Sequence, residues 1–455
     1  MNDRPNILYI FTDQQHAAAM SCVGNADIST PNLDRLAASG VRFESAYCTF
    51  PLCTASRASM MTGRTPHELG IHRNGQGIDE RFRPHELGIL FEAAGYNCVY
   101  GGKWHVPTCG QIDAGHGFRS IAPIGDPGLT DACVEFLHTE HRQPFLLVAS
   151  FDNPHNICEY ARQQILPWGP VPEPERRDLP PLPSNFAMAP EEPDALRIYQ
   201  AACPRCYPTR NYTPDDWRRY RHAYYRMVEM VDAQIGRILD ALHETGLDRN
   251  TLVVFTSDHG DSAGEHQFNQ KSVLYEASVR VPMLLRWPGR IEAGSVETQW
   301  LVSNGLDLLP TLCDAAGLPL PDGLAGRSLL PLVSGCPVTQ WRDHLVVETL
   351  LDGSVGTNVE THGRMVRTER FKYVVYSWGL HREQFYDLQS DPGEMVNLAG
   401  VGRFAKELDR HRQLLRDWCA STGDRFCLDR SAPGTPYAPQ AGLSSRTQHS
   451  RQEAP

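Results

Sequence analysis

The sequence predicts an α/β protein in which a large, mostly parallel sheet is sandwiched by helices. The first observation is a set of short, continuously apolar runs, which are typical of strands buried on both faces. The second is that segments with helical spacing of apolar residues lie between these runs, and strands that alternate with helices favour a parallel sheet. The predicted strands cover residues 6–11, 96–100, 145–151 and 252–256.

Two predicted helices have recognisable ends. The first has Thr30 in the N-cap position, Pro31 as its first helical residue and Gly40 as its closing glycine. The longest should begin near Asp215 and end before Gly246, because apolar residues recur at helical spacing between them. Both helices lie between predicted strands, as the α/β pattern requires.

The chain divides into a large catalytic domain, residues 1–340, and a smaller C-terminal α+β subdomain, residues 341–430. Within the large domain, residues 160–214 are proline-rich and are predicted to be an insertion without regular structure, of the kind that forms lids or binding segments. The subdomain has short apolar runs joined by turns, which predict an antiparallel sheet covered by a helix near residues 403–420. The polar tail, residues 431–455, is predicted to be flexible.

Four aromatic residues of the insertion are candidates for stacking on a sugar ring, and packing within the insertion is the alternative. They are Trp168, Tyr199, Tyr207 and Tyr212.

Composition excludes some classes of partner. The 455-residue chain has 43 Lys and Arg against 54 Asp and Glu, a net charge of −11, which argues against nucleic acid or an anionic membrane as partner. There is no apolar stretch long enough to span a membrane and no signal peptide, so a cytoplasmic protein is expected, or a periplasmic or secreted one if a leader was removed. The 13 cysteines lack the spacing of a disulfide framework, and the pair Cys203 and Cys206 is interpreted as reduced thiols rather than a zinc or redox site.

The most informative segment is Cys53–Arg57. Cys53 follows a proline-broken loop and begins a predicted helix, so its sulfur should lie near free backbone N–H groups that attract an anion. Arg57 is one helical turn later and can reach back over the same place. The segment therefore indicates an anion site around an unusual nucleophile, and a buried structural cysteine is the alternative.

Reactive side chains follow each of the four predicted strands. In an open parallel sheet, the loops at the carboxyl ends of the strands share one crevice, where ligands bind. Any one of these residues could be a cap, a loop hydrogen-bond partner or a solvated lysine, but their joint placement favours a site. The residues are Asp13, Gln14, Lys103, His105, His155, Asp258, His259 and Lys271.

These motifs resemble the sulfatase branch of the alkaline phosphatase-like superfamily, from Pro5 to about Leu398. Cys53–Arg57 is similar to the Cys-x-Pro/Ala-x-Arg motif of type I sulfatases. In that family a modifying enzyme oxidises the cysteine to formylglycine, an aldehyde that hydrates to a diol. The resemblance thus implies an alkaline phosphatase-like fold and a sulfuric ester hydrolase. The other matching blocks are Pro5–Leu8, Gly102–His105, Pro154–His155, Thr256–Asp261, Tyr275–Pro282, Phe385–Leu388 and Asp391–Glu394.

The resemblance also implies one divalent cation. Asp13, Asp258, His259 and the modified Cys53 would be its ligands, with Gln14 in the same set. Ligands that are mostly oxygen favour Ca²⁺, with Mn²⁺ or Mg²⁺ as alternatives. Gln14 stands where many members have a second aspartate, and His259 where many have asparagine. This combination also occurs in relatives that use Mn²⁺ or act on phosphonates and phosphodiesters.

The resemblance assigns roles in sulfate-ester hydrolysis to five further residues. The cation and Arg57 would hold one hydroxyl of the diol for attack on sulfur, which gives a covalent sulfo-enzyme. His155 and Lys271 are candidates to protonate and stabilise the leaving alcohol. His105 would take the proton of the second hydroxyl to release sulfate, and Lys103 would orient the diol.

The predicted function is therefore hydrolysis of a sulfate ester, either a small molecule or an oligosaccharide. A sulfated carbohydrate is favoured over an aryl or alkyl sulfate. Two alternatives stay open: a phosphonate monoester or phosphodiester hydrolase with the same site, and a non-catalytic sulfated-glycan-binding protein in which Cys53 is unmodified.

Overall fold

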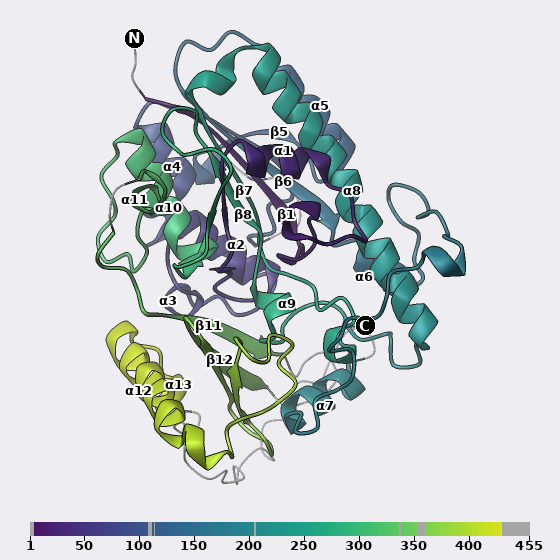
Figure 1. Ribbon diagram of the computed structural model, residues 1–455. Coiled ribbons are helices and arrows are strands. Elements are labelled where there is room, and N and C mark those ends of the chain that lie inside the picture. Colours follow the sequence, from purple (N-terminus) through teal and green to yellow (C-terminus); the bar gives the residue numbers. More distant parts are fainter. Residues whose placement is uncertain are drawn as a thin grey trace, which may run out of the picture.

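The computed structural model describes residues 4–107, 112, 114–203, 206–335, 338–352 and 360–429. A large α/β unit contains the N-terminal strand, and a smaller unit near the C-terminal end of the described chain packs against one edge of it (Figure 1). The predicted flexible tail lies outside the described residues. Within them, no helix combines the length and the apolar character needed to cross a bilayer.

The main sheet has eight strands within the described residues, in the order β5-β4-β6-β1-β7-β8-β2-β9. The strands from β5 to β7 are parallel, and β8 runs antiparallel to both β7 and β2. The four strands predicted from apolar runs are β1, β4, β6 and β7, which lie side by side, so the prediction of a mostly parallel sheet is confirmed. The bounds are β1 Asn6–Asp13, β2 Val41–Phe43, β4 Asn97–Gly102, β5 Arg119–Ala122, β6 Phe145–Pro154, β7 Thr251–Ser257, β8 Met283–Arg286 and β9 Ser295–Glu297.

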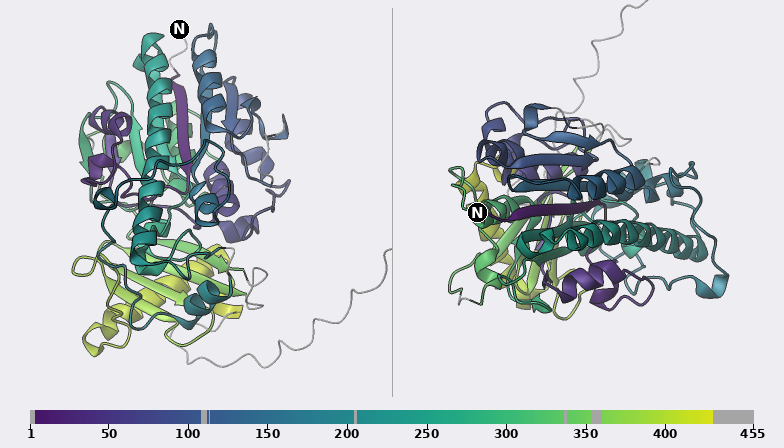
Figure 2. Two further views of the ribbon diagram at one scale, coloured as in Figure 1. Left: turned by 90° about the vertical axis from the view of Figure 1, so that its right-hand side faces the viewer. Right: turned by 90° about the horizontal axis from the view of Figure 1, so that it is seen from above.

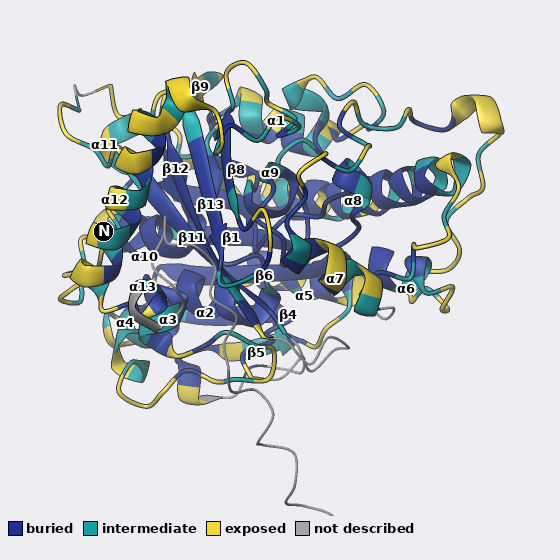
Figure 3. Ribbon diagram, turned by 90° about the horizontal axis from the view of Figure 1, so that it is seen from below, coloured by how far each residue is buried: buried dark blue, intermediate teal, exposed yellow. Residues whose placement is uncertain are grey.

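Helices cover both faces of this sheet (Figure 2). Side chains of β1 alternate between two hydrophobic cores: Ile7 and Phe11 belong to one, Leu8 and Ile10 to the other. The first core lies under α2 (Cys53–Thr62), α4 (Leu87–Ala93) and α10 (Asn304–Ala316). The second lies under α1 (Pro31–Ala38), α5 (Asp126–Leu137) and α8 (Pro214–Glu244). The central strands β1, β4, β6 and β7 are almost entirely buried, as their continuous apolar runs predicted (Figure 3).

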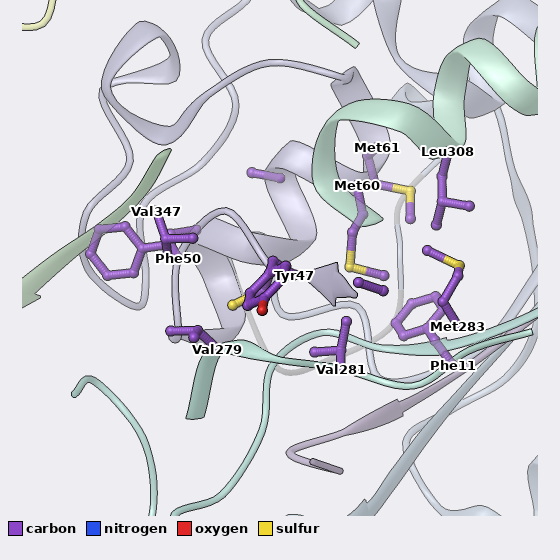
Figure 4. Packing of buried hydrophobic residues seen from close by; sticks show 14 of the residues in the cluster. Phe11, Tyr47, Phe50, Met60, Met61, Val279, Val281, Met283, Leu308 and Val347 are labelled. Atoms are coloured by element: carbon purple, nitrogen blue, oxygen red, sulfur yellow. The ribbon is translucent and has the colours of Figure 1, made fainter. Parts of the chain in front are cut away.

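The first core fixes α2 against the sheet. Met60 and Met61 of α2 meet Leu308 of α10, and Phe11 of β1 and Met283 of β8 pack below them (Figure 4). All ten residues of α2 are buried. The start of α2 is consequently held at the carboxyl edge of the sheet.

The N-terminus of α1 differs from the prediction. Thr30 occupies the N-cap position, but its side chain does not cap the helix; it accepts a hydrogen bond from the Ser21 N–H at 2.9 Å. The capping acceptor is Asp232 of α8, which receives the N–H groups of Asn32 at 3.2 Å and Leu33 at 2.8 Å. A carboxylate 200 residues away in sequence thus satisfies the free donors of the helix start.

Gly40 closes α1 for a reason other than a left-handed cap. The C-cap residue is Ser39, and a Cβ atom on Gly40 would lie 2.2 Å from the Leu285 carbonyl oxygen of β8. The glycine therefore allows close approach of two backbones. By contrast, α8 begins and ends as predicted, with Thr213 accepting from the Asp216 N–H in a capping box.

The insertion contains more regular structure than predicted. It includes α7 (Asp194–Ala202), whose apolar side Ala195, Leu196 and Tyr199 is buried against the first core. Tyr199 and Tyr207 pack edge to face with ring centroids 5.5 Å apart, and Tyr212 packs on Trp217. All three tyrosines therefore pack on other aromatic rings, and stacking on a sugar ring stays a prediction for Tyr199 and Tyr207, which also line a cavity.

The smaller unit is a four-stranded antiparallel sheet within the described residues, in the order β11-β12-β13-β14, with α12 on one face. This confirms the predicted α+β character of the C-terminal part. Its bounds are β11 His344–Leu351, β12 Thr361–Thr368, β13 Phe371–Tyr376, β14 Glu383–Asp387, α12 Ala405–Thr422 and α13 Phe426–Asp429. The remaining short elements are β3 Ala46–Tyr47, β10 Val302–Ser303, α3 Pro66–Leu69, α6 Ile157–Ala161, α9 Glu276–Val279 and α11 Leu330–Val333.

Candidate active site

Cys53 is the first residue of α2 and is fully buried. Its Sγ, which stands where an oxygen of formylglycine would be, lies 2.9 Å from Lys271 Nζ and 3.3 Å from His259 Nε2. Burial and the Asp13 carboxylate favour the neutral thiol, but Lys271, His259 and His105 outweigh them and hold the pKa of Cys53 well below its usual value. The site therefore stabilises negative charge at this position.

Arg57 reaches the site, and its guanidinium is bound to two carboxylates. Its Nε donates to Asp258 Oδ2 at 2.8 Å and its Nη2 to Asp13 Oδ2 at 2.9 Å. Its Nη1 donates to the Lys103 carbonyl at 2.6 Å and to Ser150 Oγ at 2.9 Å. One helical turn does bring Arg57 to the site, but two buried carboxylates attract the guanidinium more strongly than a single thiol does. Arg57 thus fixes the two carboxylates.

Four of the predicted cation ligands come together. The donor atoms of Asp13, Cys53, Asp258 and His259 all lie within 4.8 Å of one another. Because Arg57 takes the Oδ2 atom of each aspartate, the Oδ1 atoms face the cluster, 3.6 Å from Cys53 Sγ for Asp13 and 3.5 Å from His259 Nε2 for Asp258. We name these four residues the active-site cluster.

The donor set fits a divalent cation. His259 Nδ1 lies 2.9 Å from the Gly260 carbonyl, which can only accept, so Nδ1 carries a proton and Nε2 points to the cluster. Although burial lowers the pKa of His259, Asp258 outweighs burial and raises it, so a cation would bind Nε2 in place of a proton. Two carboxylate oxygens and an oxygen in place of the sulfur are ligands suited to a hard cation. The residues present therefore fit the cation that the sequence predicted.

Gln14 lies beside this cluster with its side chain turned toward other groups. Its Nε2 donates to Asp261 Oδ2 at 2.7 Å, and its backbone N–H donates to Asp258 Oδ1 at 3.1 Å. Its backbone has a left-handed conformation, with φ of 75°. Gln14 as a ligand stays a prediction.

The two lysines occupy different places. Lys103 Nζ lies 2.9 Å from both Asp13 Oδ2 and Asp152 Oδ1, so it holds a carboxylate of the cluster. Lys271 Nζ contacts Cys53 Sγ directly. Although burial disfavours both ammonium groups, the neighbouring anionic groups raise the pKa of each lysine above its usual value, and both are charged.

A cavity of about 470 Å³ leads to this site. His105, His155 and Lys271 line it. Burial and the charges of Lys103 and Lys271 hold the pKa of His155 well below its usual value, so its imidazole is neutral. The other walls come from the loop after α3 (His72, Arg73 and Asn74), from α6 and its end (Cys158, Glu159 and Arg162), from the insertion (Tyr199, Cys206 and Tyr207) and from β11 and its end (Leu350 and Asp352).

Two family models match the chain. The one described as Sulfatase matches residues 5–318, well over half of the chain. The chain belongs to the sulfatase family. A second model, described as N-sulphoglucosamine sulphohydrolase, C-terminal, matches residues 264–417. The resemblance read from the motifs is confirmed: this sulfatase is a sulfuric ester hydrolase with an alkaline phosphatase-like fold.

The sulfatase is similar along most of its length to proteins of stated activity. It is 31% identical over 448 residues to Delta 4,5-hexuronate-2-O-sulfatase of Bacteroides thetaiotaomicron, covering 93% of this chain and 90% of that one. The solved structure of a 2-O GAG sulfatase superposes with a TM-score of 0.84 at 30% identity, covering 93% of each chain. Phosphonate monoester hydrolase of Agrobacterium radiobacter superposes with a TM-score of 0.75 at 25% identity, covering 92% of this chain and 96% of that one.

Sequence reasoning assigned no role to several residues that support the site of this sulfatase. Asp261 accepts from Gln14, from the Tyr220 hydroxyl at 3.0 Å and from the Gln270 N–H at 3.1 Å. Asp152 holds Lys103. Both aspartates stand within three residues of a predicted site residue, and this proximity in sequence could have indicated that they support the site. The cavity residues His72, Arg73 and Arg162 follow no predicted strand, and no local pattern marked them.

Proposed function

We propose that this sulfatase hydrolyses the sulfate ester of a carbohydrate, with a formylglycine derived from Cys53 as nucleophile and one divalent cation, Ca²⁺ first, as cofactor. The observation that carries the proposal is the convergence of the active-site cluster, two charged lysines and two histidines on the Cys53 side chain at the end of one cavity. A sulfate-binding protein would not need a nucleophile position that is buried among three other metal-ligand atoms.

The residues of the chain would have the following roles in catalysis. The hydrated aldehyde would supply the attacking hydroxyl, and the cation would lower the pKa of that hydroxyl. Lys103 and Arg57 keep the aspartates in place, and Lys271 provides a fixed positive charge next to the reacting oxygen atoms. His105 and His155 border the same space and are the groups that would move protons.

His155 can act as a general acid only when the substrate is bound. Its pKa is lowered by burial and by the two lysines, so its imidazole is neutral in the free protein. The negative charge of a sulfate ester beside it would offset the lysine charges and raise that pKa. Lys271 is charged throughout, so it stabilises the leaving oxygen while His155 gives up a proton.

The similarity to a hexuronate sulfatase favours an acidic sugar as the group that carries the sulfate. The cavity volume of about 470 Å³ is within the range of pockets for small molecules and leaves room for a sugar ring. Its walls carry charges of both signs, since Arg73 lies 3.2 Å from Asp352 and Arg162 lies 3.7 Å from Glu159. The hexuronate named for the Bacteroides relative is an acidic sugar, so a 2-O-sulfated hexuronate is the first substrate to test.

The second candidate is a phosphonate monoester or phosphodiester hydrolase. The pair Gln14 and His259, together with the likeness to the Agrobacterium phosphonate monoester hydrolase, favours it. Turnover of an aryl sulfate, a phosphodiester and a phosphonate monoester by one preparation separates the two candidates. A higher kcat/KM on the phosphonate than on every sulfate ester would replace the proposal with this alternative.

The test of the nucleophile combines mass spectrometry with one variant. The peptide around Cys53 should carry an aldehyde, and Cys53→Ala should lower kcat by at least about 10⁴-fold with an unchanged melting temperature. Cys22→Ser, which changes a cysteine outside the site, should leave turnover unchanged. Binding of sulfated sugar without hydrolysis by aldehyde-bearing protein would favour the non-catalytic alternative.

A further inference from the structure

The backbone around Lys271 is strained on both sides. Gln270 and Ser272 have φ values of 66° and 75°, a left-handed conformation that residues other than glycine rarely adopt. Such strain persists only where the surrounding structure fixes the chain, and it is concentrated at functional sites. Gln270–Ser272, which we call the lysine segment, is almost fully buried. The surrounding structure therefore fixes the position of the Lys271 backbone.

The catalytic domain supplies one set of contacts to the lysine segment. The Gln270 N–H donates to Asp261 at 3.1 Å, and the Gln270 carbonyl accepts from the Ser262 N–H at 2.8 Å. The Ser272 N–H donates to the Pro51 carbonyl at 3.0 Å, two residues before Cys53. The segment is thus tied both to the loop that carries the cation ligands and to the loop that carries the nucleophile.

Three further contacts come from the C-terminal sheet and from the insertion, and in one of them Gln270 Nε2 donates to the Cys206 carbonyl at 2.6 Å. The other two involve hydroxyl groups. The Thr349 hydroxyl, on β11 of the C-terminal sheet, donates to the Ser272 carbonyl at 2.6 Å. The Tyr207 hydroxyl, from the insertion, points to the Lys271 carbonyl at 3.4 Å. Thr349 is fully buried, and its hydroxyl makes the shorter of the two hydroxyl contacts. Among the described residues, it is the direct side-chain hydrogen bond from the C-terminal sheet to the lysine segment.

We propose that Thr349 is a positioning residue for catalysis that acts through Lys271. By holding the Ser272 carbonyl it keeps the strained turn in place, and the turn aims the Lys271 ammonium at the reacting atoms, 2.9 Å from Cys53 Sγ. Lysine is a point charge on a flexible stem, so its position depends on where its backbone is fixed. The inference rests on the proposed function, because the benefit is a charge placed for the leaving oxygen.

The kinetic experiment is a double-mutant cycle. Thr349→Val removes the hydroxyl at constant shape and should lower kcat on phenyl sulfate about tenfold, with KM little changed. The loss on 4-nitrophenyl sulfate should be smaller, since nitrophenolate needs less stabilisation. Thr349→Ser keeps the donor and should retain turnover near that of wild type. In a Lys271→Ala background, Thr349→Val should cause no additional loss.

A matched control and a structure complete the test. Thr368→Val removes a hydroxyl on the neighbouring strand β12, where it contacts Phe371 and His411, and should leave kcat unchanged. In a crystal structure of Thr349→Val, Ser272 should leave the left-handed conformation and Lys271 Nζ should move by about 1 Å or more. That readout does not depend on turnover, so it tests the inference even if wild type hydrolyses no sulfate ester.

The proposal is overturned by either of two results. One is a Thr349→Val structure in which φ of Ser272 and the contact from Nζ to Sγ are unchanged. The other is a Thr349→Val loss of kcat that is equally large in the Lys271→Ala background, because the threonine would then act by another route.

Discussion

Among the described residues, two groups of side chains bring enough donor atoms together to bind a metal ion, and each group contacts an arginine in a different way. One is the active-site cluster. The other, which we call the subdomain cluster, consists of His67, Glu348 and Asp424. In both, the donor atoms lie within 4.8 Å of one another. Proximity and burial alone do not distinguish them.

The position of the arginine distinguishes the two clusters. In the active-site cluster Arg57 binds the outer Oδ2 atoms of both aspartates, so its guanidinium leaves the inner Oδ1 atoms facing the cluster. Among the residues that the structure describes, Asp258 Oδ1 accepts only from the backbone N–H groups of Gln14 and His259, which carry no net charge. In the subdomain cluster Arg364 binds both oxygens of Asp424, at 2.6 and 3.0 Å, and lies 3.2 Å from Glu348 Oε2. The protein's own cation therefore neutralises the acids of the second cluster. A cation site requires carboxylates whose inward-facing oxygen atoms are not bound by an arginine.

The largest effect that follows from this contrast is on cation binding. Asp258→Asn should weaken Ca²⁺ binding by at least about 100-fold and lower kcat by about 10³-fold, because it removes an inner-facing carboxylate oxygen. Calorimetric titration of metal-free protein measures the first and steady-state kinetics the second. The same substitution in the subdomain cluster, Asp424→Asn, should leave Ca²⁺ affinity unchanged. Equal weakening by both variants would show that the clusters are not distinct.

The next effect is on stability. Arg364→Met leaves Glu348 and Asp424 without their buried cation and should lower the free energy of unfolding by about 3–5 kcal/mol. Ca²⁺ affinity at the active-site cluster should not change. Urea unfolding of the metal-free protein measures the loss. A loss below about 1 kcal/mol would mean that the arginine is not needed to neutralise these acids.

The smallest effect is a pH dependence in the subdomain cluster. Burial raises the pKa of Glu348, but Arg364 and His67 outweigh burial and lower it from 4.5 to about 2. Because the folded pKa is depressed, the ionised form contributes stability above the unfolded pKa, and this contribution is lost as pH falls toward the folded pKa. Between about pH 5 and about pH 3, wild type should lose about 2 kcal/mol that Glu348→Gln does not lose. Parallel pH profiles of unfolding for the two proteins would contradict the assignment.

The fold and most of the site could be predicted because they depend on local patterns. The runs that became β1, β4, β6 and β7 are apolar throughout, and parallel strands place their carboxyl ends at one edge. The motif residues after those strands accordingly meet at Cys53.

Other features depend on contacts between residues far apart in sequence. Asp232 caps a helix 200 residues away, and Thr349 holds a carbonyl 77 residues away. The direction of Arg57 was also unpredictable, since helical spacing places its Cα but the two aspartates decide where its guanidinium lies. Helix α7 was missed because prolines on both sides masked a short apolar stripe.

The burial of α2 bears on the order in which Cys53 is oxidised and the helix docks. Cys53 begins a helix whose ten residues are all enclosed by the sheet and by α10. If a second enzyme oxidises this cysteine, as the proposed function requires, it has to enclose the thiol in its own catalytic centre, and the folded protein buries that thiol. We therefore expect the oxidation to precede the docking of α2, while the segment is still exposed.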